Sequence, residues 1–493
     1  MDSKWDYDAV VVGAGPNGLA AAIRLAQMGL STLLLEANEE PGGACRTEEL
    51  TVSGFWHDVG SAVHPLAVAS PFFSSLPLQE KGLRWLHPEV PLAHPINADV
   101  AVALKRSLSE TAAALGRDAV SYIRLFKPLT AAYSDLLEEF LQPILHIPRY
   151  PFRAARFGAQ AILSARRLVR NQFREEATRA LLGGLSAHSF LSLSSPGSAA
   201  FALLLGMLGH AVGWPLPYGG ARSLTEALVK HLVSLGGKIQ TGTAVTSLKQ
   251  LPRARVILLD ITPRQFVRLA EDRLPPGYLR RLTRFKYGPG VVKIDYALDR
   301  PLPWIHEICH RSGTIHIGGT FEAIAEAEAE VARGKCPEWP FLLVCQPTLF
   351  DPTRAPAGMQ IAWVYCHVPN GSTFDMTARI ERQIDRFAPG FRAHIIARRT
   401  SLPGDLERQN PNLIGGAITG GANNLWHMIA RPILSPVPYR TPLQGTFLCS
   451  SSTPPGGGVH GMCGLHAANA ALRFLAEKRR ISNCDSGSSV VRH

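Results

Sequence analysis

The sequence predicts an α/β protein with a parallel sheet built from distant segments, an inserted mixed-sheet domain and a helical cap. Two glycine-rich turns, each between a strand-like run and a helix-forming run, lie at residues 13–18 and 456–461. Between them, a region of helical apolar spacing is followed by alternating strand-like and helical runs, as expected of a separate domain. Because 493 residues exceed the usual size of one hydrophobic core, we expect more than one domain.

The composition is that of a folded chain. Hydrophobic residues make up 46% of the sequence and charged residues 18%, which is too apolar for a disordered chain. The eight cysteines form no CxxC pair, and the most apolar run, residues 199–209, is too short to cross a bilayer. The amino terminus is acidic and has no apolar core of a signal peptide. These features lead us to expect a cytoplasmic protein.

The first glycine turn has the features of a dinucleotide-binding site. Residues 9–12 form a short apolar run, Gly13, Gly15 and Gly18 follow at once, and a helix-forming stretch comes next. The first two glycines permit a tight turn and the approach of a pyrophosphate, and the third permits close packing of helix and strand. Glu36, at the end of the next strand-like run, would accept hydrogen bonds from ribose hydroxyls. A carboxylate here opposes the additional phosphate of NADP.

Further glycine segments extend this site. Gly42 and Gly43 let the chain run close along an extended cofactor, and Arg46 would face its pyrophosphate. Far along the chain, a strand-like run ending at Cys449 leads into the glycine-rich loop 456–461 and a helix. A helix N-terminus stabilises negative charge, so two such sites at opposite ends of the chain suit one extended cofactor.

These motifs, with a proline and glycine-pair turn that begins at Pro217, resemble the phytoene desaturase and carotenoid isomerase superfamily of FAD-dependent oxidoreductases. The nearest likeness is to its branch with a pyridine nucleotide-disulfide oxidoreductase domain. The resemblance implies FAD as cofactor and a glutathione-reductase-type Rossmann FAD-binding domain. It also implies that the backbone of Val245 contacts the adenine end of the cofactor.

The chain departs from the family pattern at three places. Ser450 follows Cys449 where relatives usually have glycine, and Ala417 stands where they often have a polar or acidic residue. Only residues 246–255 separate Val245 from the next strand-like run, whereas relatives usually have a long β-meander there. We expect flavin binding to survive these differences.

The expected cofactor-binding residues come from three separate parts of the chain. They are Gly13, Gly15, Pro16, Asn17, Gly18, Glu36, Ala37, Gly42, Gly43, Arg46, Gly60, Ser61, Val245, Ser450, Gly457, Gly458, Val459, His460, Gly461 and Met462. The candidates for catalysis are His64 and His460, each with a structural, hydrogen-bonded histidine as the alternative interpretation. The sequence contains no metal-ligand spacing, so we expect no metal.

The expected domains are interleaved along the chain. FAD-binding segments are residues 1–103, 213–284 and 411–480, the helical cap is 104–212, the mixed-sheet substrate domain is 285–410, and a flexible tail is 481–493. The cofactor domain would therefore be assembled from distant segments.

The net charge of +12 is partly concentrated between Arg149 and Arg174. Here Phe152, Ile162 and Phe173 belong to one helical stripe of apolar residues surrounded by arginines. Such a helix either makes peripheral contact with an anionic membrane surface or packs its stripe inward as part of the cap. No recognised motif for nucleic-acid binding is present, so nucleic acid is not expected as a partner.

The sequence thus favours an FAD-dependent oxidoreductase that transfers a hydride from a hydrophobic, polyene or lipid-like substrate to flavin, as a desaturase or isomerase. Quinone or oxygen would reoxidise the flavin. Two alternatives remain open. An amine oxidase-like flavoenzyme acting on a small substrate predicts an aromatic cage and a lysine beside the flavin, and a flavin-binding scaffold predicts no turnover.

Overall fold

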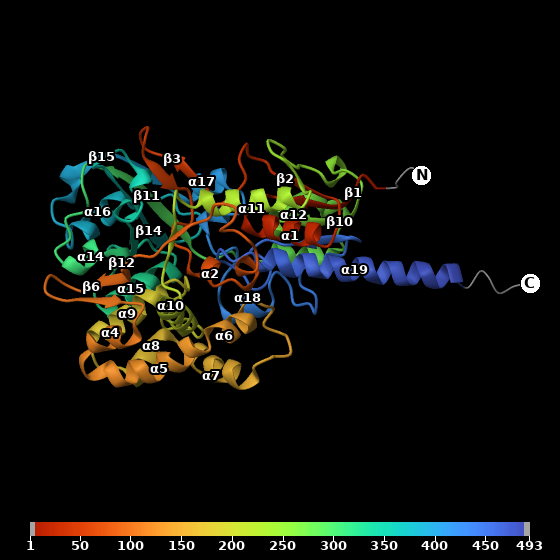
Figure 1. Cartoon of the computed structure of the whole chain (residues 1–493). Helices are drawn as coiled ribbons and strands as arrows, with labels where there is room; N and C mark the ends of the chain where they lie inside the picture. Colours follow the sequence, from red (N-terminus) through yellow and green to blue (C-terminus); the bar gives the residue numbers. More distant parts are fainter. Residues whose placement is uncertain (1–4, 488–493) are drawn as a thin grey trace, which may run out of the picture.

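The computed structural model describes the backbone of residues 5–487 and the side chains of residues 5–480. Two β-sheets lie side by side, and a layer of helices lies beneath the second of them (Figure 1). The first and last described residues are both on the side of the first sheet (Figure 1).

The first sheet has five parallel strands drawn from three distant parts of the chain. In spatial order they are β16 (Thr446–Leu448), β10 (Ala254–Leu259), β1 (Tyr7–Val12), β2 (Thr32–Leu35) and β9 (Lys238–Gln240). Every neighbouring pair is parallel. β2 is buried along its whole length, as expected of a parallel sheet that is covered on both faces.

Five helices accompany this sheet. They are α1 (Pro16–Gln27), α11 (Arg222–Ser234), α12 (Pro263–Ala270), α13 (Pro276–Thr283) and α19 (Met462–Gly487). α1 begins directly after the first glycine turn, and Gly29, with φ of 74°, follows its last turn as the left-handed residue that commonly ends a helix. α1 packs against both α19 and α11, so the two ends of the chain meet beside this sheet.

The second sheet has seven strands and is mixed. Their spatial order is β15 (Ile395–Ser401), β11 (Gly290–Leu298), β14 (Gln360–Val368), β13 (Leu342–Cys345), β12 (Ser312–Ile317), β6 (Val90–Pro95) and β7 (Ala101–Leu104). Only the β6–β12 pair is parallel. The sequence-based division placed residues 90–103 in an FAD-binding segment. They pair with this second sheet because β6 finds its partner more than two hundred residues away.

The helical cap comprises α4 (Leu108–Ala113), α5 (Ala119–Ala131), α6 (Tyr133–Phe140), α7 (Pro151–Ala161), α8 (Ala165–Gln172), α9 (Glu176–Ala187) and α10 (Ala199–Ala211). The single apolar stripe expected between Arg149 and Arg174 is wrong. Ser164 starts a new helix by accepting a hydrogen bond from the Arg167 N–H at 3.2 Å. As a result Phe152 on α7 is 89% exposed, whereas Phe173 after α8 is buried.

The remaining strands and α-helices complete the described fold. They are β3 (Thr47–Glu49), β4 (Trp56–Asp58), α2 (Pro65–Val68), α3 (Pro71–Ser74), β5 (Trp85–Leu86), β8 (Leu216–Pro217), α14 (Glu307–His310), α15 (Phe321–Ala332), α16 (Thr377–Asp385), α17 (Pro403–Gln409) and α18 (Leu425–Ile429). α19 continues to Gly487, so this helix covers the first part of the segment expected to be a flexible tail. Residues 488–493 of that segment lie outside the described residues.

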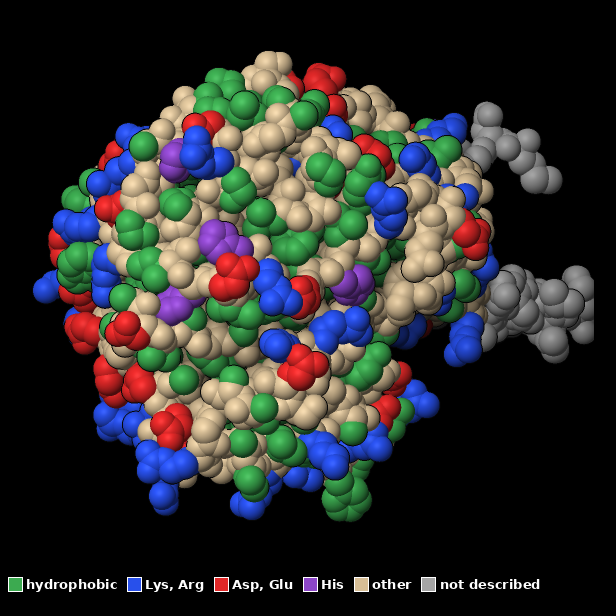
Figure 2. All heavy atoms as spheres, turned by 60° about the vertical axis from the view of Figure 1, so that its left-hand side comes forward, with side chains coloured by type: hydrophobic (Ala, Val, Ile, Leu, Met, Phe, Trp, Pro, Cys, Tyr) green, Lys and Arg blue, Asp and Glu red, His purple; other side chains and the backbone are tan. Residues whose placement is uncertain are grey.

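The positive charge does not form a continuous basic surface on the face shown in Figure 2, where basic and acidic side chains are interspersed. Several arginines of α7 and α8 are paired. Arg153 forms an ion pair with Asp135, and Arg166 and Arg170 both contact Glu322. Of the helices that the structure describes, none combines the length and the apolarity needed to cross a membrane.

Candidate cofactor and substrate site

A cavity of about 1090 Å³ connects the glycine turns of the first sheet to the second sheet and the helical cap. Fourteen of the expected cofactor-binding residues line it. They are Gly13, Gly15, Pro16, Asn17, Glu36, Ala37, Gly43, Gly60, Ser61, Val245, Gly457, Gly458, Val459 and His460. The structure therefore brings segments more than four hundred residues apart to one cavity wall.

The other expected residues are near this wall but do not line it. Gly18 faces the turn itself, since a Cβ there would lie 1.9 Å from the Gly13 carbonyl oxygen. The hydroxyl of Ser450 donates to the Ile261 carbonyl at 2.7 Å. Arg46, expected to face a pyrophosphate, forms an ion pair with Glu48 at 3.0 Å. Gly42, Gly461 and Met462 also lie outside the lining.

Glu36 is held in place by backbone donors. Its carboxylate accepts hydrogen bonds from the Ala14 N–H at 2.7 Å and from the Asn38 N–H at 3.0 Å. The Asn38 side-chain amide donates to the same carboxylate at 2.8 Å. Each carboxylate oxygen has two acceptor positions, and three of these four are used, so Oε2 can still accept one bond from a ribose hydroxyl in the cavity. The cradle fits the adenosine half of a dinucleotide such as FAD.

Asp260 is a site residue that the sequence analysis did not select. It follows β10, lines the cavity, and its Oδ2 accepts the Gly18 N–H at 3.0 Å. A Cβ on Gly15 would lie 3.0 Å from this same oxygen, which shows how closely the glycine turn approaches the carboxyl group. Burial, with a smaller contribution from the charge of Glu36, raises the pKa of Asp260 from its ordinary 3.8 to about 7.

This shift predicts a pH-dependent stability. Between about pH 4 and pH 7 the folded chain holds a proton on Asp260 that the unfolded chain has released, so the free energy of unfolding falls as pH rises through that window. Asp260→Asn keeps an acceptor for Gly18 and does not titrate. We expect its free energy of unfolding, relative to that of the native chain, to increase by on the order of 2–4 kcal/mol from pH 5 to pH 8. Urea unfolding at both pH values measures this difference. Identical pH slopes for the two proteins would contradict it.

The two histidine candidates are neutral and tied to the backbone. The Met462 N–H donates to His460 Nδ1 at 3.0 Å, and burial lowers the pKa of His460 to about 4. His64 Nε2 lies 3.2 Å from the Ser61 carbonyl oxygen, and burial also lowers its pKa. Both rings line the cavity. Near neutral pH, these uncharged rings are suited to hydrogen bonding more than to acting as general acids.

The wall formed by the second sheet carries a buried ion pair. Lys293 and Asp295 lie on β11, and Lys293 Nζ is 2.6 Å from Asp295 Oδ1. Lys293 lines the cavity beside Trp363 and Tyr365, whose ring centroids are 5.1 Å apart at an angle of 82°. Desolvation lowers the pKa of Lys293 and raises the pKa of Asp295. The sequence around Lys293 and Asp295 resembles that of an ordinary strand. Their contact with β14 joins parts of the chain that are far apart in sequence, so no local motif could reveal it.

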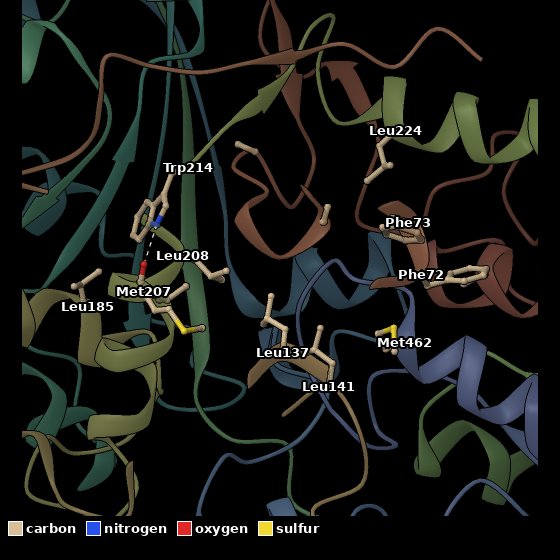
Figure 3. Packing of buried hydrophobic residues seen from close by; sticks show 14 of the residues in the cluster. Phe72, Phe73, Leu137, Leu141, Leu185, Met207, Leu208, Trp214, Leu224 and Met462 are labelled. Atoms are coloured by element: carbon tan, nitrogen blue, oxygen red, sulfur yellow. Dashed lines mark hydrogen bonds between the residues drawn. The ribbon is translucent and has the colours of Figure 1, made fainter. Parts of the chain in front are cut away.

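The remaining wall is apolar and comes mainly from the cap. Phe157, Phe201 and Leu204 line it from α7 and α10. In Figure 3, Leu137 and Leu141 lie between Met207 on one side and Met462 on the other, and Leu141 also lines the cavity. The Leu141 carbonyl oxygen, directly after α6, lies 2.7 Å from His466 Nε2, so the cap contacts α19. The cavity has one wall of polar backbone and one of hydrocarbon.

Comparisons with known proteins agree with this arrangement. Residues 11–74 match an NAD(P)-binding Rossmann-like domain. The chain is 28% identical to pyridine nucleotide-disulfide oxidoreductase domain-containing protein 2 of Rattus norvegicus, covering 96% of this chain and 94% of that protein. It is 24% identical to a lycopene-forming phytoene desaturase of Pseudescherichia vulneris, covering 94% and 98%. The chain is a homologue of these proteins. The resemblance inferred from its motifs is thereby confirmed.

Solved structures show the same fold. An oxidoreductase from Methanosarcina mazei superposes with a TM-score of 0.66 at 16% identity, over 94% of this chain and 99% of that one. Putrescine oxidase bound to putrescine gives a TM-score of 0.62 at 16% identity, over 95% and 99%. The predicted α/β fold with a Rossmann domain is confirmed. These likenesses support an FAD-type oxidoreductase and imply a flavin cofactor.

Proposed function

We propose that this chain acts on an apolar, polyene or lipid-like molecule, either as a desaturase that passes a hydride to flavin and loses the neighbouring proton, or as an isomerase without net oxidation of the substrate. The observation that carries the proposal is the continuous cavity, which joins the glycine cradle to a wall of aromatic and aliphatic side chains. A hydrocarbon placed against that wall would be within the same enclosure as the cofactor. When bound, the flavin supplies a hydride acceptor.

The chain itself would supply orientation and electrostatics. The N-termini of α1 and α19 both follow glycine turns at the cavity, where unpaired N–H groups favour negative charge on a cofactor. The apolar wall of the cap would exclude water from the reacting bond. Desaturation needs few ionisable groups, which agrees with the neutral state of His64 and His460. Quinone or oxygen would then reoxidise the flavin.

Anaerobic mixing tests the proposal. The purified, flavin-loaded protein is mixed without oxygen with a carotenoid, a fatty-acid ester or an alkylamine, and the flavin absorbance is followed. Bleaching by the apolar compounds supports the proposal. Bleaching by the amine alone would favour the amine oxidase-like alternative, and no bleaching by any compound would favour a flavin-binding scaffold without turnover.

One observation favours the amine oxidase-like alternative. Lys293 and the paired rings of Trp363 and Tyr365 lie together on the cavity wall, as an aromatic cage and a nearby lysine would require. Against it, Lys293 is paired with Asp295 and the cap side of the cavity is apolar. We therefore keep the apolar substrate as the first proposal.

We also propose that the cavity opens toward a lipid surface. Large apolar side chains of the α6–α7 connection and of α18 are exposed, and some of them line the cavity as well. The exposed side chains are Ile144, Leu145, Ile147, Phe152 and Ile162 on the cap and Leu425, Trp426 and Ile429 on α18. Of these, Ile144, Ile162, Leu425 and Ile429 also line the cavity. Exposed apolar patches of this kind mark interaction sites. Insertion of these apolar side chains into the lipid, more than contacts of the paired arginines of α7, would attach the chain to the membrane surface.

The double change Ile147→Ser with Phe152→Ser should weaken binding to phosphatidylcholine vesicles by at least about tenfold, because these side chains are 96% and 89% exposed. Co-sedimentation with vesicles measures it. Met28→Ser with Val233→Ser removes two exposed apolar side chains near the first sheet and serves as the control. Equal loss in both double variants would contradict a specific attachment site on the cap.

A further inference from the structure

Three histidines that the proposed reaction does not use lie together beside the cavity. His188 and His316 are hydrogen-bonded, and the His94 ring lies 6.3 Å from the His316 ring. His188 follows α9, His316 lies on β12, and His94 lies on β6. His94 and His316 are completely buried, whereas His188 lines the cavity. The group is not a metal site, since no cluster among the described residues is placed to hold a metal ion.

All three rings are neutral. Burial lowers the pKa of His188 to about 3 and that of His94 to about 4, and it lowers the pKa of His316 well below its ordinary value. A neutral imidazole has one N–H donor and one nitrogen acceptor. The hydrogen-bond partners therefore determine which nitrogen of each ring carries the proton.

The partners assign the protons one by one. His94 Nε2 lies 2.8 Å from the Gly319 carbonyl oxygen, which can only accept, so His94 carries its proton on Nε2. His316 Nδ1 is buried without a partner, and a buried N–H without an acceptor is rarer than an unpaired acceptor. His316 therefore carries its proton on Nε2, which lies 3.0 Å from His188 Nε2.

The proton of His188 must then be on Nδ1. Its Nε2 accepts the hydrogen bond from His316, and a neutral ring has one proton to place. His188 Nδ1 has no hydrogen-bond partner within the described residues and is not among the buried polar atoms, so it is open to the cavity. His188 thus offers the cavity one uncharged N–H donor.

This donor is away from the glycine loop that precedes α19. The His188 ring lies 5.9 Å from the Trp214 ring, edge to face. Trp214 and Met462, the first residue of α19, lie on opposite sides of the cluster drawn in Figure 3. The indole N–H of Trp214 donates to the Leu205 carbonyl, so it does not compete for a ligand. A molecule reaching from the cofactor cradle along the apolar wall would end near His188.

We propose that His188 Nδ1–H binds an uncharged oxygen, of a ketone, aldehyde, ester or alcohol, at one end of an otherwise apolar ligand. The inference rests on the proposed function for the claim that this ligand is the substrate. An ammonium group has only donors and would meet a donor here. A carboxylate would lose its hydration, and both cations of the cavity wall are already engaged: Lys293 is paired with Asp295, and Arg431 donates to backbone carbonyls.

Binding of matched probes tests this assignment. Decane, 2-decanone and decylammonium compete with an apolar fluorescent dye for the purified holoprotein. We expect 2-decanone to bind about 3- to 10-fold more tightly than decane, as one added hydrogen bond allows, and more tightly than decylammonium. His188→Phe should reduce the ketone preference to about one. His188→Gln keeps an amide donor and acceptor and should retain the preference.

Two further measurements complete the test. Nitrogen NMR of histidine-labelled protein should show His188 protonated on Nδ1, with its signals identified by their loss in His188→Phe. His210→Phe is the control, because His210 is a buried histidine of the cap that does not line the cavity, and it should leave the ketone preference unchanged. Equal binding of decane and 2-decanone by the native chain, tighter binding of decylammonium, or a proton on His188 Nε2 would overturn the assignment.

The outcome separates this assignment from the proposed function. A ketone preference that depends on His188, without flavin bleaching by any compound, would overturn the proposed function and leave His188 as a ligand-binding residue. Flavin bleaching by a hydrocarbon without a ketone preference would overturn the role of His188 alone.

Discussion

Gly15→Val should yield a folded chain that retains almost no flavin. Gly15 precedes α1 with φ of −69° and ψ of 174°, a backbone conformation that valine also adopts. A Cβ there would meet only Asp260 Oδ2, at 3.0 Å. The two methyl groups would add bulk at the N-terminus of α1, where a pyrophosphate is bound in dinucleotide sites of this type. We expect flavin content to fall by at least about tenfold.

Absorbance of the purified protein measures this, as the ratio of flavin to protein before and after incubation with FAD. Gly277→Val is the matched control: Gly277 lies on α13, and a Cβ there would meet nothing within 4 Å. Thermal unfolding of both variants checks that the fold is retained. If Gly15→Val takes up FAD as the native chain does, the first glycine turn is not the cofactor site.

The first glycine turn and Glu36 of the candidate cofactor site could be singled out from the sequence because their signals are local. Gly13, Gly15 and Gly18 act within a single turn, and Glu36 follows at the end of the adjacent strand. The loop before α19 is likewise continuous in sequence. In such segments, residues that are close in the sequence are also close in the fold.

The substrate side could not be predicted in the same way. Lys293 reaches Trp363 only because β11 pairs with β14, and His188 reaches His316 only because the end of α9 packs against β12. Asp260 becomes unusual only when β10 places it under the glycine turn. Each of these residues has an unremarkable neighbourhood in the sequence, and its role comes from a partner far along the chain.

A different kind of signal was overlooked on the cap. The apolar spacing across α7 and α8 agreed with one continuous helix, but Ser164 has the side chain that starts a new helix. Because the chain turns there, the apolar residues of the two helices point to different places. Phe152 reaches the surface and Phe173 enters the core.

Lys293→Met should be among the most destabilising single changes in the protein. Asp295 is completely buried, and Lys293 Nζ is 2.6 Å from its carboxylate. His57 Nδ1, at 3.7 Å, is no substitute, because desolvation lowers its pKa to about 3 and keeps it uncharged. Removing one partner of a buried ion pair typically costs about 3–5 kcal/mol of stability. We expect Asp295→Leu to have a similar cost, since it leaves Lys293 unpaired.

The double change Lys293→Met with Asp295→Leu gives the decisive comparison. Both charges then leave the interior together, and such replacements are often neutral or stabilising by about 1–4 kcal/mol. Chemical denaturation of the native chain, both single variants and the double variant measures the coupling. The exposed pair Arg311 and Glu89, replaced by Met and Leu in the same way, should change stability by no more than about 1 kcal/mol. A double variant as unstable as the single ones would contradict this account of the pair.

A stable double variant would also bear on why the pair exists. If the fold does not need Lys293 and Asp295, a role of the buried charges in the site that they face can be tested separately from stability. The double variant then isolates that contribution, because its flavin content and its reduction by substrate can be compared with those of the native chain at equal stability. Loss of reduction with normal flavin content would place Lys293 in the handling of substrate, and unchanged reduction would leave the pair with no role in the reaction.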